Sequence, residues 1–219
     1  MVSAAEQMAA NLSWSSIGKA KDLQNRILYA LLLLIIYRAG TYVPVPGVDA
    51  EQLKVFFEQN AQGIGGMLNM FTGGAVGRMA VFALGIMPYI TSSIIMQLLT
   101  SMVPYLEQLK KEGEQGRQKI NQYTRYGTVL LAFFQSWGIA AGIESQGLAS
   151  EPGLFFRVSC VVTLVGGTML LMWLGEQITQ RGIGNGISLI IYFGIIAELP
   201  GALGQFFASV RSGALSAFT

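Results

Sequence analysis

The sequence has no histidine and only one cysteine, and 12% of its 219 residues are charged, against about 25% in a typical soluble domain. The absence of histidine excludes imidazole-based catalysis and metal ligation. The lone Cys160 excludes an internal disulfide and a four-cysteine metal site. The net charge of +2 is too small to indicate nucleic-acid binding. The chain is instead rich in hydrophobic residues, at 52%, and in glycine, with 27 residues, which is typical of closely packed membrane helices.

We therefore predict an all-α, polytopic membrane protein without a bound cofactor or metal. Five apolar runs are long enough, or nearly so, to cross a bilayer. They lie at 27–43, 78–103, 126–143, 157–175 and 187–210. Glu198 and Pro200 interrupt the last run, and the sequence offers no physical reason for a carboxylate within a span.

The second run contains a proline in an otherwise apolar stretch. No residue between Met79 and Leu106 is charged, yet Gly85 and Pro88 lie inside the 78–103 span. A proline within a helix removes one backbone donor and frees the carbonyl four residues earlier, at a cost of about 3 kcal/mol. In lipid, that carbonyl must be satisfied by protein or by water in a cavity. The sequence therefore predicts a proline-interrupted helix that lines a cavity.

The distribution of lysine and arginine predicts the orientation of these spans. Basic residues concentrate in three segments that we place in the cytoplasm: 1–26, 104–125 and 176–186. Few occur in the segments that we place on the other side: 44–77, 144–156 and 211–219. The positive-inside rule then predicts a cytoplasmic N-terminus. Residues 1–26 have no short apolar core and no cleavage site, so we expect the first span to insert uncleaved.

The predicted external loop, 44–77, combines stiff, amphipathic and glycine-rich parts. Two prolines in VPVPGVD (43–49) favour an extended exit from the first span. AEQLKVFFEQ (50–59) has the spacing of a short amphipathic helix, with Leu53, Phe56 and Phe57 on one side. The glycine-rich part that follows carries an apolar cluster, which a loop in water has little reason to expose. We interpret 64–77 as a short apolar helix, hinged by glycine, that packs into the bundle; a flexible surface loop is the alternative.

Several other features have ordinary structural interpretations. The glycine-rich GEQITQRGIGNGIS (175–188) follows a membrane helix, so it indicates a tight turn with Asn185 or Ser188 as helix cap, not a dinucleotide site. The polar residues at depth are Thr91, Ser92, Ser93 and Gln135, and their simplest role is hydrogen bonding between helices. Two isoleucine pairs lie at i, i+4 spacing: Ile86 with Ile90, and Ile187 with Ile191. Periodicity alone indicates packing or lipid contact, and does not select these residues over Ile94, Ile95 or Ile190.

Four long stretches, in order, resemble the N-terminal half of the SecY family of protein-conducting channels. They are YRAGTYVPVPGVD, NMFTGGAVGRMAVFALGIMPYITSSIIMQLLT, INQYTRYGTV with its preceding basic loop, and MWLGEQITQRGIGNGISLIIYFGI. The resemblance runs from about residue 22 to residue 200. It implies five spans that form one half of a ten-helix channel, in which two inverted repeats clamp a central pore.

The resemblance also implies roles for individual residues. The segment at about 64–77 would be the plug, with Ile64, Met67, Leu68, Asn69, Met70, Phe71, Gly73 and Gly74. This half's share of the apolar pore ring would be Ile86, Ile90, Ile187 and Ile191. The second and third spans would form one side of the lateral gate, with Ser92, Ser93 and Gln135 as candidate polar contacts. An apolar ring offers a passing polypeptide no hydrogen bond, while its narrowness and dewetting oppose ion leak.

The implied function is that of the central pore subunit of the Sec translocon in the bacterial inner membrane. It would pass unfolded secretory polypeptides across and release membrane helices laterally into lipid. The implied partners are the second half of the channel (spans 6–10), SecE and SecG, the SecA ATPase or the ribosome or both, signal peptides and nascent polypeptides, and membrane lipids. The alternatives are half of a secondary transporter and a passive scaffold subunit. An intramembrane enzyme would need a catalytic constellation that the sequence does not offer.

Overall fold

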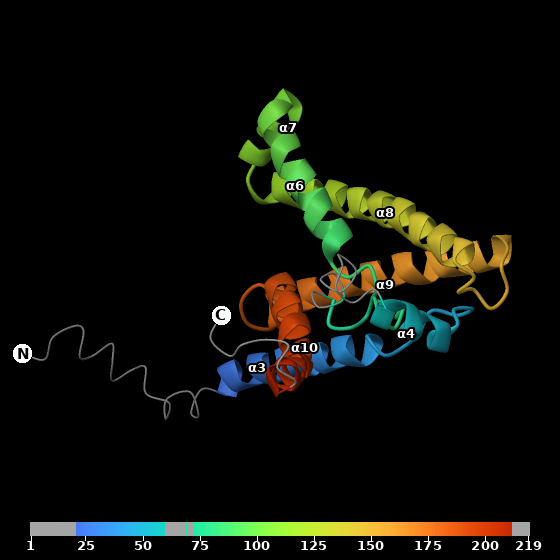
Figure 1. The fold of residues 1–219 in the computed structure, drawn as a ribbon. Helices are drawn as coiled ribbons and strands as arrows, with labels where there is room; N and C mark the ends of the chain where they lie inside the picture. Colours follow the sequence, from blue (N-terminus) through green and yellow to red (C-terminus); the bar gives the residue numbers. More distant parts are fainter. Residues whose placement is uncertain (1–20, 60–68, 70–71, 212–219) are drawn as a thin grey trace, which may run out of the picture.

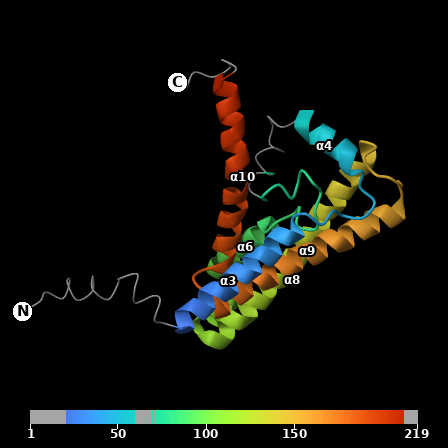
Figure 2. The same cartoon turned by 90° about the horizontal axis from the view of Figure 1, so that it is seen from below.

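The structure is a computed structural model that describes residues 21–59, 69 and 72–211. Within these ranges the chain is helical, with two isolated β-bridges and no strand. The helices are α3 (Lys21–Gly40), α4 (Ala50–Gln59), α6 (Met87–Met102), α7 (Pro104–Lys111), α8 (Glu114–Ser145), α9 (Leu154–Arg181) and α10 (Gly186–Arg211). Helix α9 is central: α8 packs along it as an antiparallel hairpin partner, and α3 and α10 also contact it (Figure 1). In the second view, α10 projects away from the bundle (Figure 2).

Among the described residues, three helices are long and apolar enough to cross a membrane. They are Glu114–Ser145, Leu154–Arg181 and, within α10, Gly186–Gly204. Helix α3 buries one face only, because Ala30, Leu33, Leu34 and Tyr37 recur at helical spacing. Its other faces expose Leu28 and Ile35 at 66% and 70%, which suits a lipid environment. The count of five spans stays a prediction.

The predicted position of Pro88 at the centre of a helix is wrong. Residues 72–86 form turns, and α6 starts at Met87, so Pro88 lies in its first turn. Gly85, with φ at +58°, has a left-handed backbone conformation that does not belong to a helix, and Ile86 is the N-cap of α6. A proline in the first turn removes no hydrogen bond, because the amide there has no partner within the helix. Pro88 therefore starts a helix and does not interrupt one.

The predicted cytoplasmic loop 104–125 is mostly helical. It contains α7, which buries Leu106 and Leu109, and the first turns of α8. Gly113, with φ at +79°, makes the sharp turn between the two helices. On the solvent side of α7, the Lys111 ammonium lies 2.7 Å from the Glu107 carboxylate and lowers its pKa.

The predicted elements around the external loop are confirmed where the structure describes them. The amphipathic helix is α4, with Leu53 buried. The extended exit 43–49 forms a bridge to Ala80 on one side and to Ala149, in the α8–α9 loop, on the other. At the other end of the bundle, Asn185 caps α10: its Oδ1 accepts hydrogen bonds from the amides of Ile187 (3.0 Å) and Ser188 (3.4 Å).

Helices α8 and α9 pack closely through small residues. On α8 the buried residues recur at every fourth position, with Thr124, Thr128, Ala132, Ser136 and Ala140. The hydroxyls among them donate to carbonyls of their own helix, so no polar group is left unpaired in the contact. Ion pairs hold the hairpin at both ends, between Arg125 and Glu176 and between Glu144 and Arg157.

Candidate functional site

The turn segment 72–86 positions the candidate site, although it has no regular helix. Its backbone is deeply buried, and Ala75 and Ala80 have no exposed surface. Asn69 organises its start: its carbonyl accepts from the Gly74 amide (2.8 Å) and its Oδ1 from the Gly77 amide (2.6 Å). Further on, the Val81 amide donates to the Val43 carbonyl (2.9 Å). The segment is therefore fixed both by its own turns and by the loop that follows α3.

Three of the four predicted ring residues meet around one cavity. Ile86 and Ile90 at the start of α6 and Ile191 on α10 line a cavity of about 240 Å³. Its other lining residues are Tyr37, Thr72, Gly85, Met87, Leu171 and Ile190. Ile187 packs instead against α9, where a Cβ built on Gly175 would lie 3.0 Å from its Cγ1. The cavity thus lies between α3, α6, α9, α10 and the turn segment 72–86.

Only part of the predicted plug falls within the described residues. Ile64, Met67, Leu68, Met70 and Phe71 lie outside them. Of the others, Gly73 and Gly74 are buried with φ at +63° and +81°, and Asn69 is half-buried. Residues 72–77 form turns, in which these positive φ values suit glycine, and the role of the two glycines as a hinge stays a prediction.

The predicted gate contacts lie in different places. Ser92 is buried and donates from Oγ to the Thr124 carbonyl on α8 (2.8 Å). Ser93 lines a polar cavity of about 280 Å³ with Lys110 and Arg117. Gln135 lines a separate, mostly apolar cavity of about 590 Å³ between α4, α8 and the turn segment. The structure thus shows Ser92 as a contact between α6 and α8, and does not group it with Gln135.

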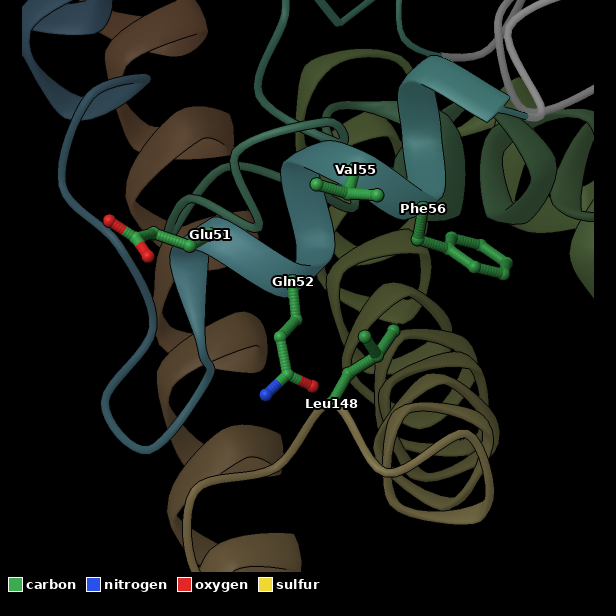
Figure 3. A pocket seen from close by; sticks show the side chains of 5 residues that line it. All are labelled: Glu51, Gln52, Val55, Phe56 and Leu148. Atoms are coloured by element: carbon green, nitrogen blue, oxygen red, sulfur yellow. The ribbon is translucent and has the colours of Figure 1, made fainter.

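A further hollow of about 420 Å³ lies beside α4 (Figure 3). It is lined by Glu51, Gln52, Val55, Phe56 and Leu148. Gln52 on α4 and Leu148 in the α8–α9 loop point toward the same space (Figure 3). None of the predicted site residues lines this hollow. Across the described ranges, no three side chains of histidine, cysteine, aspartate or glutamate lie close enough together to hold a metal ion.

Sequence reasoning missed two features of the site. Ile190 lines the cavity although it does not belong to the i, i+4 pair, because the rotation of α10 decides which isoleucines face inward. Glu198 has a partner, since its Oε1 lies 3.8 Å from Nη2 of Arg38 on α3. The sequence signal for that pair was limited to the presence of Arg38 and Glu198 within predicted spans.

Comparisons with known proteins agree with this architecture. A family model described as SecY matches residues 80–219. Proteins named protein translocase subunit SecY from Pseudomonas aeruginosa, Escherichia coli K12 and Rickettsia typhi are 53%, 54% and 55% identical over 94%, 92% and 90% of this chain. The alignments cover 47%, 46% and 47% of those proteins, so the chain spans about half their length.

Solved structures share the fold at lower identity. One is described as the structure of a protein conducting channel, and another as Sec61 in the canine ribosome-channel complex from the endoplasmic reticulum. Each has a TM-score of 0.64 at 20% identity, over 87% of this chain and 42% of the other. The description of a third structure states that the plug domain of the SecY protein stabilises the closed state of the translocation channel. Its TM-score is 0.62 at 21% identity, over 87% of this chain and 41% of the other. The matched family model and the three relatives above 50% identity show that this chain belongs to the SecY family.

Proposed function

We propose that the chain forms the N-terminal half of the pore subunit of a Sec translocon, with no catalytic activity of its own. The observation that carries this proposal is the cavity at which Ile86, Ile90 and Ile191 meet. These side chains come from two different helices and offer only apolar surface. A second half with five further spans would complete the ring, and a narrow apolar ring lets a polypeptide slide while it opposes ion leak.

The remaining roles follow from the same assignment. The segment at about 64–77 would act as the plug, because Thr72, which belongs to it, lines the same cavity. Helices α6 and α8 would form one side of the lateral gate, with Ser92 holding them together. We further propose a bacterial inner-membrane location with the N-terminus in the cytoplasm. The partners would be SecE, SecG, SecA or the ribosome, signal peptides and nascent chains, and membrane lipids.

Cross-linking within the full-length subunit tests the proposal. In a Cys160→Ala background, single cysteines replace Ile86, Ile90 or Ile191, and a secretory polypeptide with one cysteine is stalled during translocation. We expect disulfide cross-links at these three positions. The matched control is Phe155→Cys on α9, whose side chain is 87% exposed on the outer surface and should not react. Equal reaction at Phe155→Cys, or none at the three isoleucine positions while the polypeptide is stalled, would contradict the proposal.

Half of a secondary transporter is the other candidate, and it is not favoured. Such a protein would normally place coupling charges near its binding site, yet the lining of the cavity at Ile86 contains no charged residue. Glu198 pairs with Arg38 outside this lining.

A further inference from the structure

Helices α6, α7 and α8 enclose a polar cavity of about 280 Å³ that is separate from the cavity at Ile86. The three helices pack against one another at one end of the molecule (Figure 1). Lys110 of α7 and Arg117 of α8 line the cavity, together with hydroxyl and amide side chains such as Ser93 and Asn121. Its lining residues include no acidic side chain. The cavity therefore holds two positive charges among hydrogen-bonding groups.

These two charges are not neutralised by the protein. Within residues 21–59, 69 and 72–211, neither Lys110 nor Arg117 forms an ion pair. The neighbouring Lys111 differs, because its ammonium lies 2.7 Å from the Glu107 carboxylate. An ammonium and a guanidinium that converge without a carboxylate are suited to bind an anion, and arginine in particular matches the geometry of phosphate.

The position of the cavity along the helices indicates which anion reaches it. Its α6 wall, which contains Ser93 and Gln97, belongs to the stretch 79–106, in which no residue is charged. Its α8 wall belongs to the basic segment 104–125. Three tyrosines of α7 and α8 are exposed close to this boundary: Tyr105, Tyr123 and Tyr126. Exposed tyrosines are typical of the headgroup region of a bilayer, where the abundant anion is the phosphate of a phospholipid.

We propose that this cavity binds the headgroup of an anionic phospholipid from the cytoplasmic leaflet. Arg117 and Lys110 neutralise the phosphate, and the Asn121 amide and the Ser93 hydroxyl donate hydrogen bonds to headgroup oxygens. A zwitterionic lipid binds more weakly, because its own cation is repelled by the two basic side chains. The bound lipid links α7 to α6 and α8. This inference uses the proposed membrane orientation but not the proposed channel activity.

The test measures lipid binding to the full-length subunit with its partner subunits. Native mass spectrometry from detergent micelles gives dissociation constants for dioleoylphosphatidylglycerol and dioleoylphosphatidylcholine. We expect phosphatidylglycerol to bind about tenfold more tightly than phosphatidylcholine. In the double variant Lys110→Gln/Arg117→Gln, the affinity for phosphatidylglycerol should fall by about tenfold to thirtyfold, since each cation near the membrane surface contributes about fivefold.

The matched control is the double variant Lys21→Gln/Arg181→Gln. It also removes one lysine and one arginine that are exposed, but neither residue lines the cavity. Its affinity for phosphatidylglycerol should equal that of the wild type. An equal loss in the two double variants, or equal affinity of the wild type for the two lipids, would overturn the proposal.

A further variant separates a site inside the cavity from general attraction to a charged surface. Asn121→Leu keeps every charge but replaces the amide with an apolar group inside the cavity. Its affinity for phosphatidylglycerol should fall by about threefold to tenfold, as for the loss of one hydrogen bond. Wild-type affinity in this variant would overturn the site. A short single-stranded RNA that binds more tightly than phosphatidylglycerol, and depends on the same two cations, would overturn the assignment to lipid. None of these measurements requires translocation, so they stand or fail independently of the channel function.

Discussion

The α8–α9 hairpin and the turn segment 72–86 both contain residues with no exposed surface, but different contacts hold them. Thr128 and Ala132 on α8 have no exposed surface, and neither do Ala75 and Ala80 in the turn segment. In α8 the helix itself pairs the backbone groups, and the small side chains need from α9 only a surface of matching shape.

The turn segment cannot satisfy its backbone in this way. Beside the hydrogen bonds of its own turns, it uses partners far away in the sequence, such as Arg38 for the Gly73 carbonyl and Val43 for the Val81 amide. In an apolar environment an unpaired backbone group costs several kcal/mol. Buried helical residues should therefore tolerate substitution, except where the backbone of a neighbouring segment lies in direct contact. Buried residues in the turn segment should instead depend on individual hydrogen bonds.

The largest effect is expected where the two regions meet. A Cβ on Gly167 of α9 would lie 2.1 Å from the carbonyl oxygen of Val81, which is backbone and cannot rotate away. We expect Gly167→Ala to lower the free energy of unfolding by about 3 kcal/mol through overpacking. Thermal unfolding in detergent micelles measures this. Gly166→Ala is the matched control, because a Cβ there meets nothing within 4 Å; equal midpoints for the two variants would contradict the close approach.

A smaller loss of stability is expected where the backbone of α8 lies against the side chain of Ser92 on α6. A Cβ on Gly127 would lie 2.5 Å from Oγ of Ser92, so Gly127→Ala should force that hydroxyl away from the Thr124 carbonyl. We expect a loss of about 1 to 2 kcal/mol, the cost of a buried hydrogen bond.

Two further variants check this mechanism by the same unfolding measurement. Gly138→Ala, on the same helix with open space at the Cβ, should be close to wild type. Ser92→Ala in the Gly127→Ala background should recover part of the loss. The mechanism is wrong if the double variant is as destabilised as the sum of the single variants.

The smallest effect is expected at the end of the hairpin. Arg125 donates to both carboxylate oxygens of Glu176, at 3.0 Å from Nε and 2.6 Å from Nη2. A double-mutant cycle with Arg125→Gln and Glu176→Gln should give a coupling energy of about 1 kcal/mol, because both groups are partly exposed. The coupling should weaken in high salt. A coupling near zero in low salt would show that shape alone holds the hairpin.

Much of the fold could be predicted because its signals are local. The uncharged runs that contain Tyr126–Ile143 and Val158–Gly175 predicted helices that the structure shows, in longer form, as α8 and α9. Asn185 was identified as a possible cap from the residue type and its position before an apolar run. Pro88 shows the limit of the same reasoning: proline suits a helix start as well as an interruption, and the left-handed Gly85 decides between them.

The residues that line the candidate site could be predicted less well from local signals. The spacing of Ile187 and Ile191 defines a helix face but not the direction in which that face points. In the structure, Ile191 lines the cavity together with Ile190, while Ile187 packs against Gly175. The ring itself was implied by family resemblance and stays a proposal for this chain.

Local sequence was thus sufficient for the helical class and for the approximate positions of α8 and α9, because hydrophobic runs are properties of neighbouring residues. Tertiary packing alone established which isoleucines share a cavity and why a carboxylate lies in the last helix. Glu198 is 160 residues away from Arg38 along the chain, and only the approach of α10 to α3 places their charges 3.8 Å apart. Such a contact depends on how whole helices pack, and no local pattern encodes it.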